Sequence, residues 1–179
     1  MRSVLPLLAA IMSLVPVGSV RCQSENTQKP VPRFEDFPVD ASFHGKPAKP
    51  VLDRNDAFRT KILEGALNGP NFAGHYTIID WGCGSGCISF AIVDAVSGRL
   101  YSPIPFSALG VPYQGAATGR EYKGLDYRVN SALLIADGCP EEKVTMTSET
   151  ENDCGTRYYK WEQNRFVLVA SIMVPAARK

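Results

Sequence analysis

The chain has 179 residues, and its 19 basic and 18 acidic residues leave a formal net charge of +1 at pH 7. This balance excludes the basic surface typical of proteins that bind nucleic acid or anionic membranes, so we expect no nucleic-acid partner. Thirteen prolines and fifteen glycines favour a loop-rich chain dominated by β-structure, and the length fits one domain.

Residues 1–19 are predicted to be a secretory signal peptide. A basic start precedes the almost wholly apolar run Val4–Val17, and small residues follow where a signal peptidase would cleave. Because this run is short for a membrane span and contains two prolines, we expect no transmembrane span after cleavage, and a location in the periplasm or outside the cell. The alternative is lipid anchoring at Cys22, but that modification needs a small preceding residue and Arg21 stands there.

The stretch 20–50 is predicted to be an extended, proline-rich lead-in to a single domain over 51–175. It contains few aliphatic side chains, yet Phe34, Phe37 and Phe43 are unusual for a solvated linker. We therefore expect Phe37-Pro38-Val39 and Phe43 to lie along the domain and to cover an edge or a face of a sheet.

A helix is predicted over Asp53–Leu67. Asp53 can cap its first turn, and apolar side chains recur at four-residue spacing from Phe58 onward. Asn68-Gly69-Pro70 should end the helix, because glycine adopts the left-handed cap conformation and proline cannot continue the helix.

Strand signals dominate the rest of the chain, where β-branched and aromatic runs alternate with turn residues. Ile88–Asp94 is apolar on both alternating faces and should be covered on both sides, whereas Gly110–Gly124 is predicted to be a long loop. The result is a predicted α+β fold, with one N-terminal helix packed on an antiparallel β-meander of about five to six strands. The predicted strands are Tyr76–Trp81, Ile88–Asp94, Arg99–Tyr101, Tyr127–Ala136, Tyr158–Trp161 and Phe166–Met173.

The five cysteines of an exported chain indicate disulfides before any other chemistry. Setting aside Cys22 near the N-terminus leaves four, and four cysteines allow three pairings. Proximity in the sequence favours Cys83–Cys87 and Cys139–Cys154.

Several motifs occur together along the chain, at Asn71–Tyr76, Trp81–Cys87, Asp94–Tyr101 and Tyr158–Leu168. In this combination the chain resembles a family of small exported bacterial proteins of unknown function, built around an NFAGHY…WGCGxGC core. The resemblance covers roughly Phe37–Val169, and its central motif is specific. It implies an exported single domain and carries no activity with it.

The glycine-rich loop enclosed by Cys83 and Cys87 is the candidate recognition surface. Its glycines allow a backbone path that presents N–H groups outward, and a disulfide would make the loop rigid. We therefore predict a monomeric, non-enzymatic recognition module for a protein or an envelope polymer such as peptidoglycan or a polysaccharide. The predicted binding residues are His75, Tyr76, Trp81, Gly84 and Ser85.

The alternative function is a small envelope hydrolase or transferase that uses His75 with an acidic residue. Ser85 with His75 and either Asp80 or Asp94 makes a nominal triad. Against this, Ser85 lies between two cysteines and lacks the Gly-x-Ser-x-Gly context of a nucleophile elbow.

Metal and redox chemistry are further alternatives for the same segment. His75, Cys83 and Cys87, completed by His44 or Asp80, could hold zinc, but their spacing matches no standard zinc finger. A redox pair is typically Cys-x-x-Cys at a helix N-terminus, whereas three residues separate these cysteines and strands flank them. We therefore expect no metal and no cofactor.

Overall fold

The computed structural model describes residues 30–41, 43–53, 58–101, 108–111, 121–141 and 154–173. By its contacts the chain divides into the units Met1–Pro30 and Val31–Lys179, and the described helices and strands all lie in the second. The predicted signal peptide and Cys22 lie outside the described residues. No helix in the described part of the chain is long and apolar enough to cross a membrane.

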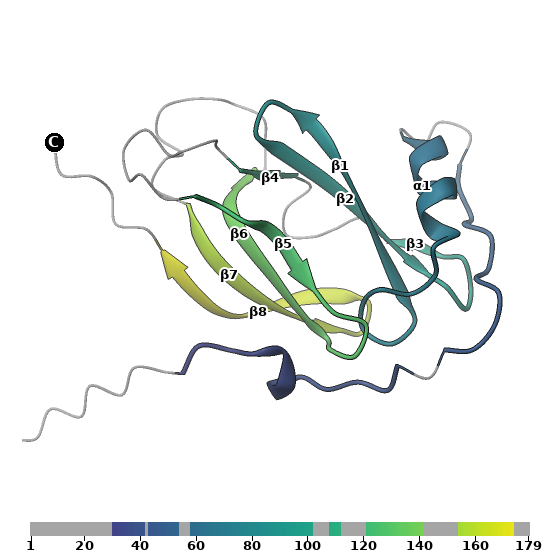
Figure 1. Cartoon of the computed structure of the whole chain (residues 1–179), viewed down its shortest axis with the longest axis horizontal. Coiled ribbons are helices and arrows are strands. Elements are labelled where there is room, and N and C mark those ends of the chain that lie inside the picture. The colour runs from purple at the N-terminus through teal and green to yellow at the C-terminus, as the bar shows by residue number, and fades with distance from the viewer. Residues whose placement is uncertain are drawn as a thin grey trace, which may run out of the picture. The chain divides into compact units, whose positions relative to one another are not determined.

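The described elements are mostly strands, as Figure 1 shows. Two short helices come first in the chain, η1, a 3-10 helix over Phe34–Asp36, and α1, an α-helix over Arg59–Ala66. The strands are β1 (Tyr76–Gly84), β2 (Cys87–Asp94), β3 (Leu100–Tyr101), β4 (Ala108–Gly110), β5 (Gly124–Tyr127), β6 (Leu133–Glu141), β7 (Gly155–Glu162) and β8 (Arg165–Met173).

These strands form one eight-stranded sheet in the order β1-β2-β4-β6-β7-β8, with β3 paired to β2 and β5 paired to β6. Every pairing is antiparallel, which confirms an antiparallel sheet with one α-helix. The predicted number of five to six strands is too low. The three-residue β4 was missed, because so short a strand is defined by its neighbours in space and not by local alternation.

The predicted single strand Tyr127–Ala136 is also wrong, because the structure divides it. β5 ends at Tyr127 and β6 begins at Leu133, and the two pair with each other, so that Tyr127 lies opposite Leu134. A turn separates them, in which the Ser131 N–H donates to the Arg128 carbonyl. Apolar residues on both sides of this turn produced the appearance of one alternating strand.

The predicted helix Asp53–Leu67 is shorter than expected and is not N-terminal, since η1 and the lead-in precede it. α1 begins at Arg59, and its N-cap residue is Phe58, which has a left-handed backbone with φ 61°, so the predicted N-cap Asp53 is wrong. Phe58 stacks on Trp81 with ring centroids 4.9 Å apart. This tertiary contact lies at the point where the helix begins, later in the sequence than predicted. The left-handed glycine predicted after the helix is confirmed, with Gly69 at φ 79°.

The two faces of β2 are both covered, as its sequence predicts. Phe90 and Ile92 belong to the main core, which also contains side chains of β6, β7 and β8. Ala91 and Val93 point the other way, into a second cluster with Ile62 of α1. The sheet therefore bends so that β1 and β2 face β6–β8 across the main core, while α1 covers the outer face of β1 and β2.

The described part of the lead-in packs on this sheet, as its aromatic residues predict. Phe34 is buried against Leu133 and Tyr158 in a third cluster. Pro38 forms an isolated bridge to Ser131, whose hydroxyl donates to the Phe34 carbonyl at 2.9 Å. The lead-in thus covers the outer face of β6 and β7 in the way that α1 covers β1 and β2.

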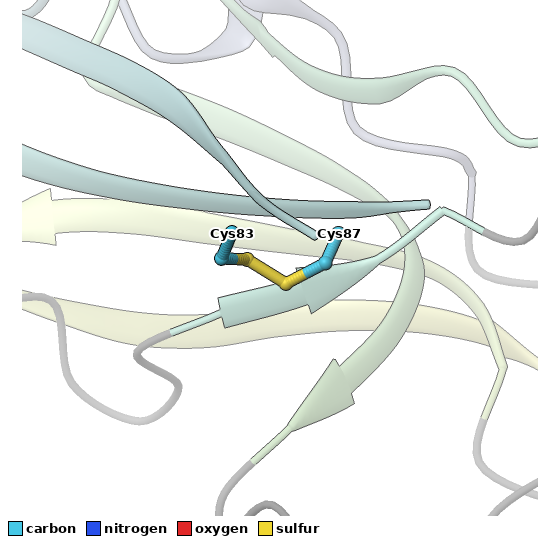
Figure 2. The surroundings of a disulfide bond; sticks show 2 residues. All are labelled: Cys83 and Cys87. Atoms are coloured by element: carbon cyan, nitrogen blue, oxygen red, sulfur yellow. A yellow bond between two sulfur atoms is a disulfide. The ribbon is translucent and has the colours of Figure 1, made fainter. Parts of the chain in front are cut away.

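Both predicted disulfides are present. Cys83 and Cys87 close the tip of the β1–β2 hairpin, with Cα atoms 5.2 Å apart (Figure 2). Cys139 of β6 and Cys154, directly before β7, are bonded with Cα atoms 4.1 Å apart, beside the paired Gly138 and Gly155. Loop closure assigns about 3 kcal/mol to this second bridge and about 2 kcal/mol to the hairpin bridge, which therefore acts more on local shape than on global stability.

Candidate functional site

The residues of the predicted triad do not meet. His75 directly precedes β1, whereas Ser85 lies in the turn after it, so the full length of the strand separates them. Nine residues at about 3.3 Å each make this separation roughly 30 Å. Asp80 lies midway between them. The hypothesis of a His75–Ser85–Asp80 site is therefore wrong, because closeness in sequence becomes distance when the segment is extended.

His75 instead lies beside the acid at the opposite end of the hairpin. Its Nε2 is 3.8 Å from Asp94 Oδ1, and its ring lies 4.3 Å from that of Tyr76. Both Asp94 oxygens already accept shorter hydrogen bonds, from the Val96 N–H at 2.8 Å and the Ser97 hydroxyl at 2.7 Å. Asp94 therefore serves first as the cap of the turn that follows β2.

The five predicted binding residues likewise do not form one surface. His75 and Tyr76 lie at the start of β1, and Gly84 and Ser85 lie at the exposed hairpin tip. Trp81 packs in the cluster beneath α1, on the helix-covered face. The prediction of one surface that joins the disulfide-closed tip to His75 and Tyr76 is therefore wrong, because the length of β1 separates them.

The Asn71–Tyr76 motif builds the fold at the start of β1. The Asn71 side chain accepts from the Ile78 N–H at 2.7 Å and donates to the Ile78 carbonyl at 2.8 Å, in the manner of a neighbouring strand. Phe72 is completely buried in the main core. Gly74 has φ 85°, and its N–H donates to the Val129 carbonyl at 2.7 Å, which fixes the turn against the β5–β6 connection.

A cleft does lie at the middle of β1, on either side of Asp80. One cavity of about 500 Å³ is lined by residues of α1, β1 and β5, and another of about 370 Å³ is lined by residues of β1, β2 and β5. We call the two together the Asp80 cleft, because Asp80 and Tyr127 line both of them. The remaining lining residues are Lys61, Glu64, Gly65, Asn68, Asn71, Ile78 and Ile79 in the first, and Ile88, Lys123, Leu125 and Asp126 in the second.

Asp80 is the one predicted candidate that this cleft contains, and the side chain beside it was not predicted. Tyr127 donates its hydroxyl hydrogen to Asp80 Oδ1 at 3.3 Å, although 47 positions separate the two residues. In the sequence, Tyr127 is typical of an aromatic residue in a β-strand. Lys61 and Glu64 are typical of the solvent-exposed face of a helix. Only the fold brings them together, so local sequence patterns gave no sign of this cleft.

Burial and the Asp80 carboxylate determine the protonation of Tyr127. Burial first, and then the charge of Asp80 and its hydrogen bond, raise the pKa of Tyr127 to about 12. Neither Lys61 nor Lys123 forms an ion pair with Asp80 in the described part of the chain. The cleft thus holds a carboxylate that is hydrogen-bonded to a neutral phenol and has no described cationic partner.

We expect this phenol to give a distinct signature at alkaline pH. The folded-state pKa of Tyr127, about 12, is above the ordinary 10.0, so its contribution to stability is complete below pH 10 and is lost as the pH rises through 12. Subtracting the phenolate absorbance titration of Tyr127→Phe from that of the unmodified chain isolates this group. The difference should have its midpoint near pH 12, and a midpoint near pH 10 would contradict the contact with Asp80.

The fold and the cleft together define a disulfide-bonded α+β protein, whose described residues form one α-helix, an antiparallel sheet and a polar cleft at the edge strand β1. No group of three or more potential metal ligands occurs among the described residues. No family model matches the chain, and no curated protein or solved structure shows significant similarity to it. Its function is therefore inferred from the cleft itself.

Proposed function

We propose that this chain is an exported, non-enzymatic recognition module that binds a protein or a polymer of the cell envelope in the Asp80 cleft. The observation that carries the proposal is the lining of the cleft, where carboxylates, amides, ammonium groups and a phenol converge. Histidine, serine and cysteine are not among the described residues that line it. Convergent polar groups in a concave surface suit recognition, and two disulfides are typical of proteins outside the cytosol.

Binding to isolated cell envelopes tests this function. The oxidised chain without residues 1–19 should sediment with envelopes saturably, and Asp80→Ala should weaken the apparent affinity at least about tenfold, the loss of roughly one charged hydrogen bond. Glu162→Ala is the matched control, because Glu162 is also an acid on a strand but lines neither cavity. Equal binding by both variants, or sedimentation that does not saturate, would refute the proposal.

The alternative remains a hydrolase or transferase that uses His75 with an acidic residue. The approach of His75 Nε2 to Asp94 Oδ1, at 3.8 Å, is the observation in its favour. Turnover of a labelled envelope polymer that His75→Ala abolishes would establish this alternative, whereas saturable binding without turnover supports the recognition module.

A further inference from the structure

β1 is the last strand of the sheet among the described residues, so one of its two edges has no described strand beside it. In an antiparallel pair, the N–H and C=O groups of alternate residues point away from the partner strand. For β1 this outward set is identified by its bonds, because the Tyr76 N–H donates to the Phe72 carbonyl and the Ile78 N–H donates to the Asn71 side chain. The next members of the outward set are Asp80 and Gly82.

The edge of β1 is therefore closed at one end and open at the other. Tyr76 and Ile78 have their outward main-chain groups bonded, whereas those of Asp80 and Gly82 have no partner in the described part of the chain. Both residues are exposed. Unpaired edge groups of this kind are a template for pairing with another strand.

The walls of the open edge leave room for such a strand. The larger cavity of the Asp80 cleft runs beside Ile78, Ile79 and Asp80, between Lys61 and Glu64 of α1 and Tyr127 of β5. Gly82 adds no side chain, and a Cβ placed on it would come no closer than 3.9 Å to the Cys87 carbonyl oxygen. Glycine in a strand permits the close approach of another backbone.

Charge decides which extended segment fits best. Among the described residues, three acidic side chains and two basic ones line the cleft, and the hydroxyl of Tyr127 is the only described partner of the Asp80 carboxylate. A lysine or arginine beside Asp80 would supply the missing cation with a charge-assisted hydrogen bond.

We propose that the open edge of β1 binds an extended polypeptide segment, which adds as a strand beside Asp80 and Gly82 and places a lysine or arginine against the Asp80 carboxylate. This proposal rests on the proposed function and narrows its ligand from a protein or an envelope polymer to a peptide strand. The two outward residues offer two N–H donors and two carbonyl acceptors to that strand. The Asn71 side chain already bonds the outward N–H and carbonyl of Ile78, so the open edge ends before Ile78.

Random nine-residue peptides displayed on phage are the probe, selected against the oxidised chain without residues 1–19. Synthetic copies of the selected peptides are then N-methylated at one position at a time. Addition as a strand predicts a loss of affinity with a period of two residues, at least about tenfold at positions whose N–H faces β1 and small at the positions between them.

Two variants of the protein test the same edge by changing β1 instead of the peptide. Gly82→Pro removes the outward N–H, and Gly82→Ala is its matched control, since it adds a Cβ but keeps that N–H. Binding should fall at least about tenfold for proline and by a smaller factor for alanine, while Glu162→Ala, which lines neither cavity, should leave it within about twofold. Because the proline variant could fail to fold, the same library is also selected against Asp80→Lys. In the peptides chosen by this variant, acidic residues should replace lysine and arginine.

The outcomes separate the ligand from the function. Peptides that bind without the two-residue period, or a library that gives no peptide binder, would overturn the proposal. If protease-treated envelopes still bind while peptides do not, the ligand is a non-protein polymer and only the proposed function survives. A concentration-dependent dimer that Gly82→Pro abolishes would identify a second copy of this chain as the occupant and would likewise overturn it.

Discussion

Phe72→Ala should lower the free energy of unfolding by about 3 to 5 kcal/mol, the range found when a buried phenylalanine is truncated. Phe72 is completely buried. Its ring centroid lies 6.1 Å from that of Phe166, 6.2 Å from that of Trp161 and 6.4 Å from that of Tyr127. The rings around it are held by three different strands, β5, β7 and β8, which cannot all close on the cavity that alanine would leave.

The same substitution at Phe58 is the matched control. Phe58 is 49% exposed and contacts chiefly the ring of Trp81, so Phe58→Ala should cost no more than about 1.5 kcal/mol. Urea unfolding of both variants, with the disulfides intact, measures the difference. Equal costs would show that Phe72 is not the centre of the main core.

Phe72 also links the core to the Asp80 cleft. Its ring meets the ring of Tyr127 edge-on, and the Tyr127 hydroxyl reaches Asp80. The motif that is most recognisable in the sequence contributes Asn71 to the lining of the cleft, and its other residues act on the cleft indirectly, by fixing the turn and the core behind it.

The sequence predicted well those features that depend on local periodicity. The strands at Tyr76, Ile88, Tyr158 and Phe166 lie where alternation placed them, and the hairpin at Gln163-Asn164 has the positive φ angles that such a tight turn needs. Both disulfides follow from proximity in sequence, because each joins neighbouring strands at or near a hairpin.

The features that failed depend on the path of the chain through space. An apolar spacing that continues through Phe58 cannot reveal that this residue turns left-handed to stack on Trp81. The distance between His75 and Ser85 depends on the rise per residue of a β-strand. It can be calculated only once the segment between them is recognised as one long strand. The approach of Tyr127 to Asp80 requires the complete sheet order, which no local pattern contains.

Gly98→Ala should have the second large effect, a loss of about 2 to 5 kcal/mol in the free energy of unfolding. Gly98 has φ 75°, a left-handed conformation that costs another residue about 1 to 2 kcal/mol. An added Cβ would also overlap the carbonyl oxygen of Lys49, where overpacking costs a further 1 to 3 kcal/mol, roughly. The lead-in and the β2–β3 turn meet at this point, since the Gly98 carbonyl accepts from the Val51 N–H at 2.8 Å.

Amide hydrogen exchange locates this damage as well as measuring it. The N–H groups of Ala48 and Val51 bond across to the turn, each at 2.8 Å, so both should exchange faster in Gly98→Ala while amides in the middle of β2 stay protected.

Gly82→Ala is the control, because Gly82 has no positive φ and a Cβ there has space. Its unfolding free energy should change by less than about 1 kcal/mol. If the two glycine variants lost equal stability, the conformation of Gly98 would not be what holds the lead-in to the sheet, and the cost would belong to glycine replacement in general.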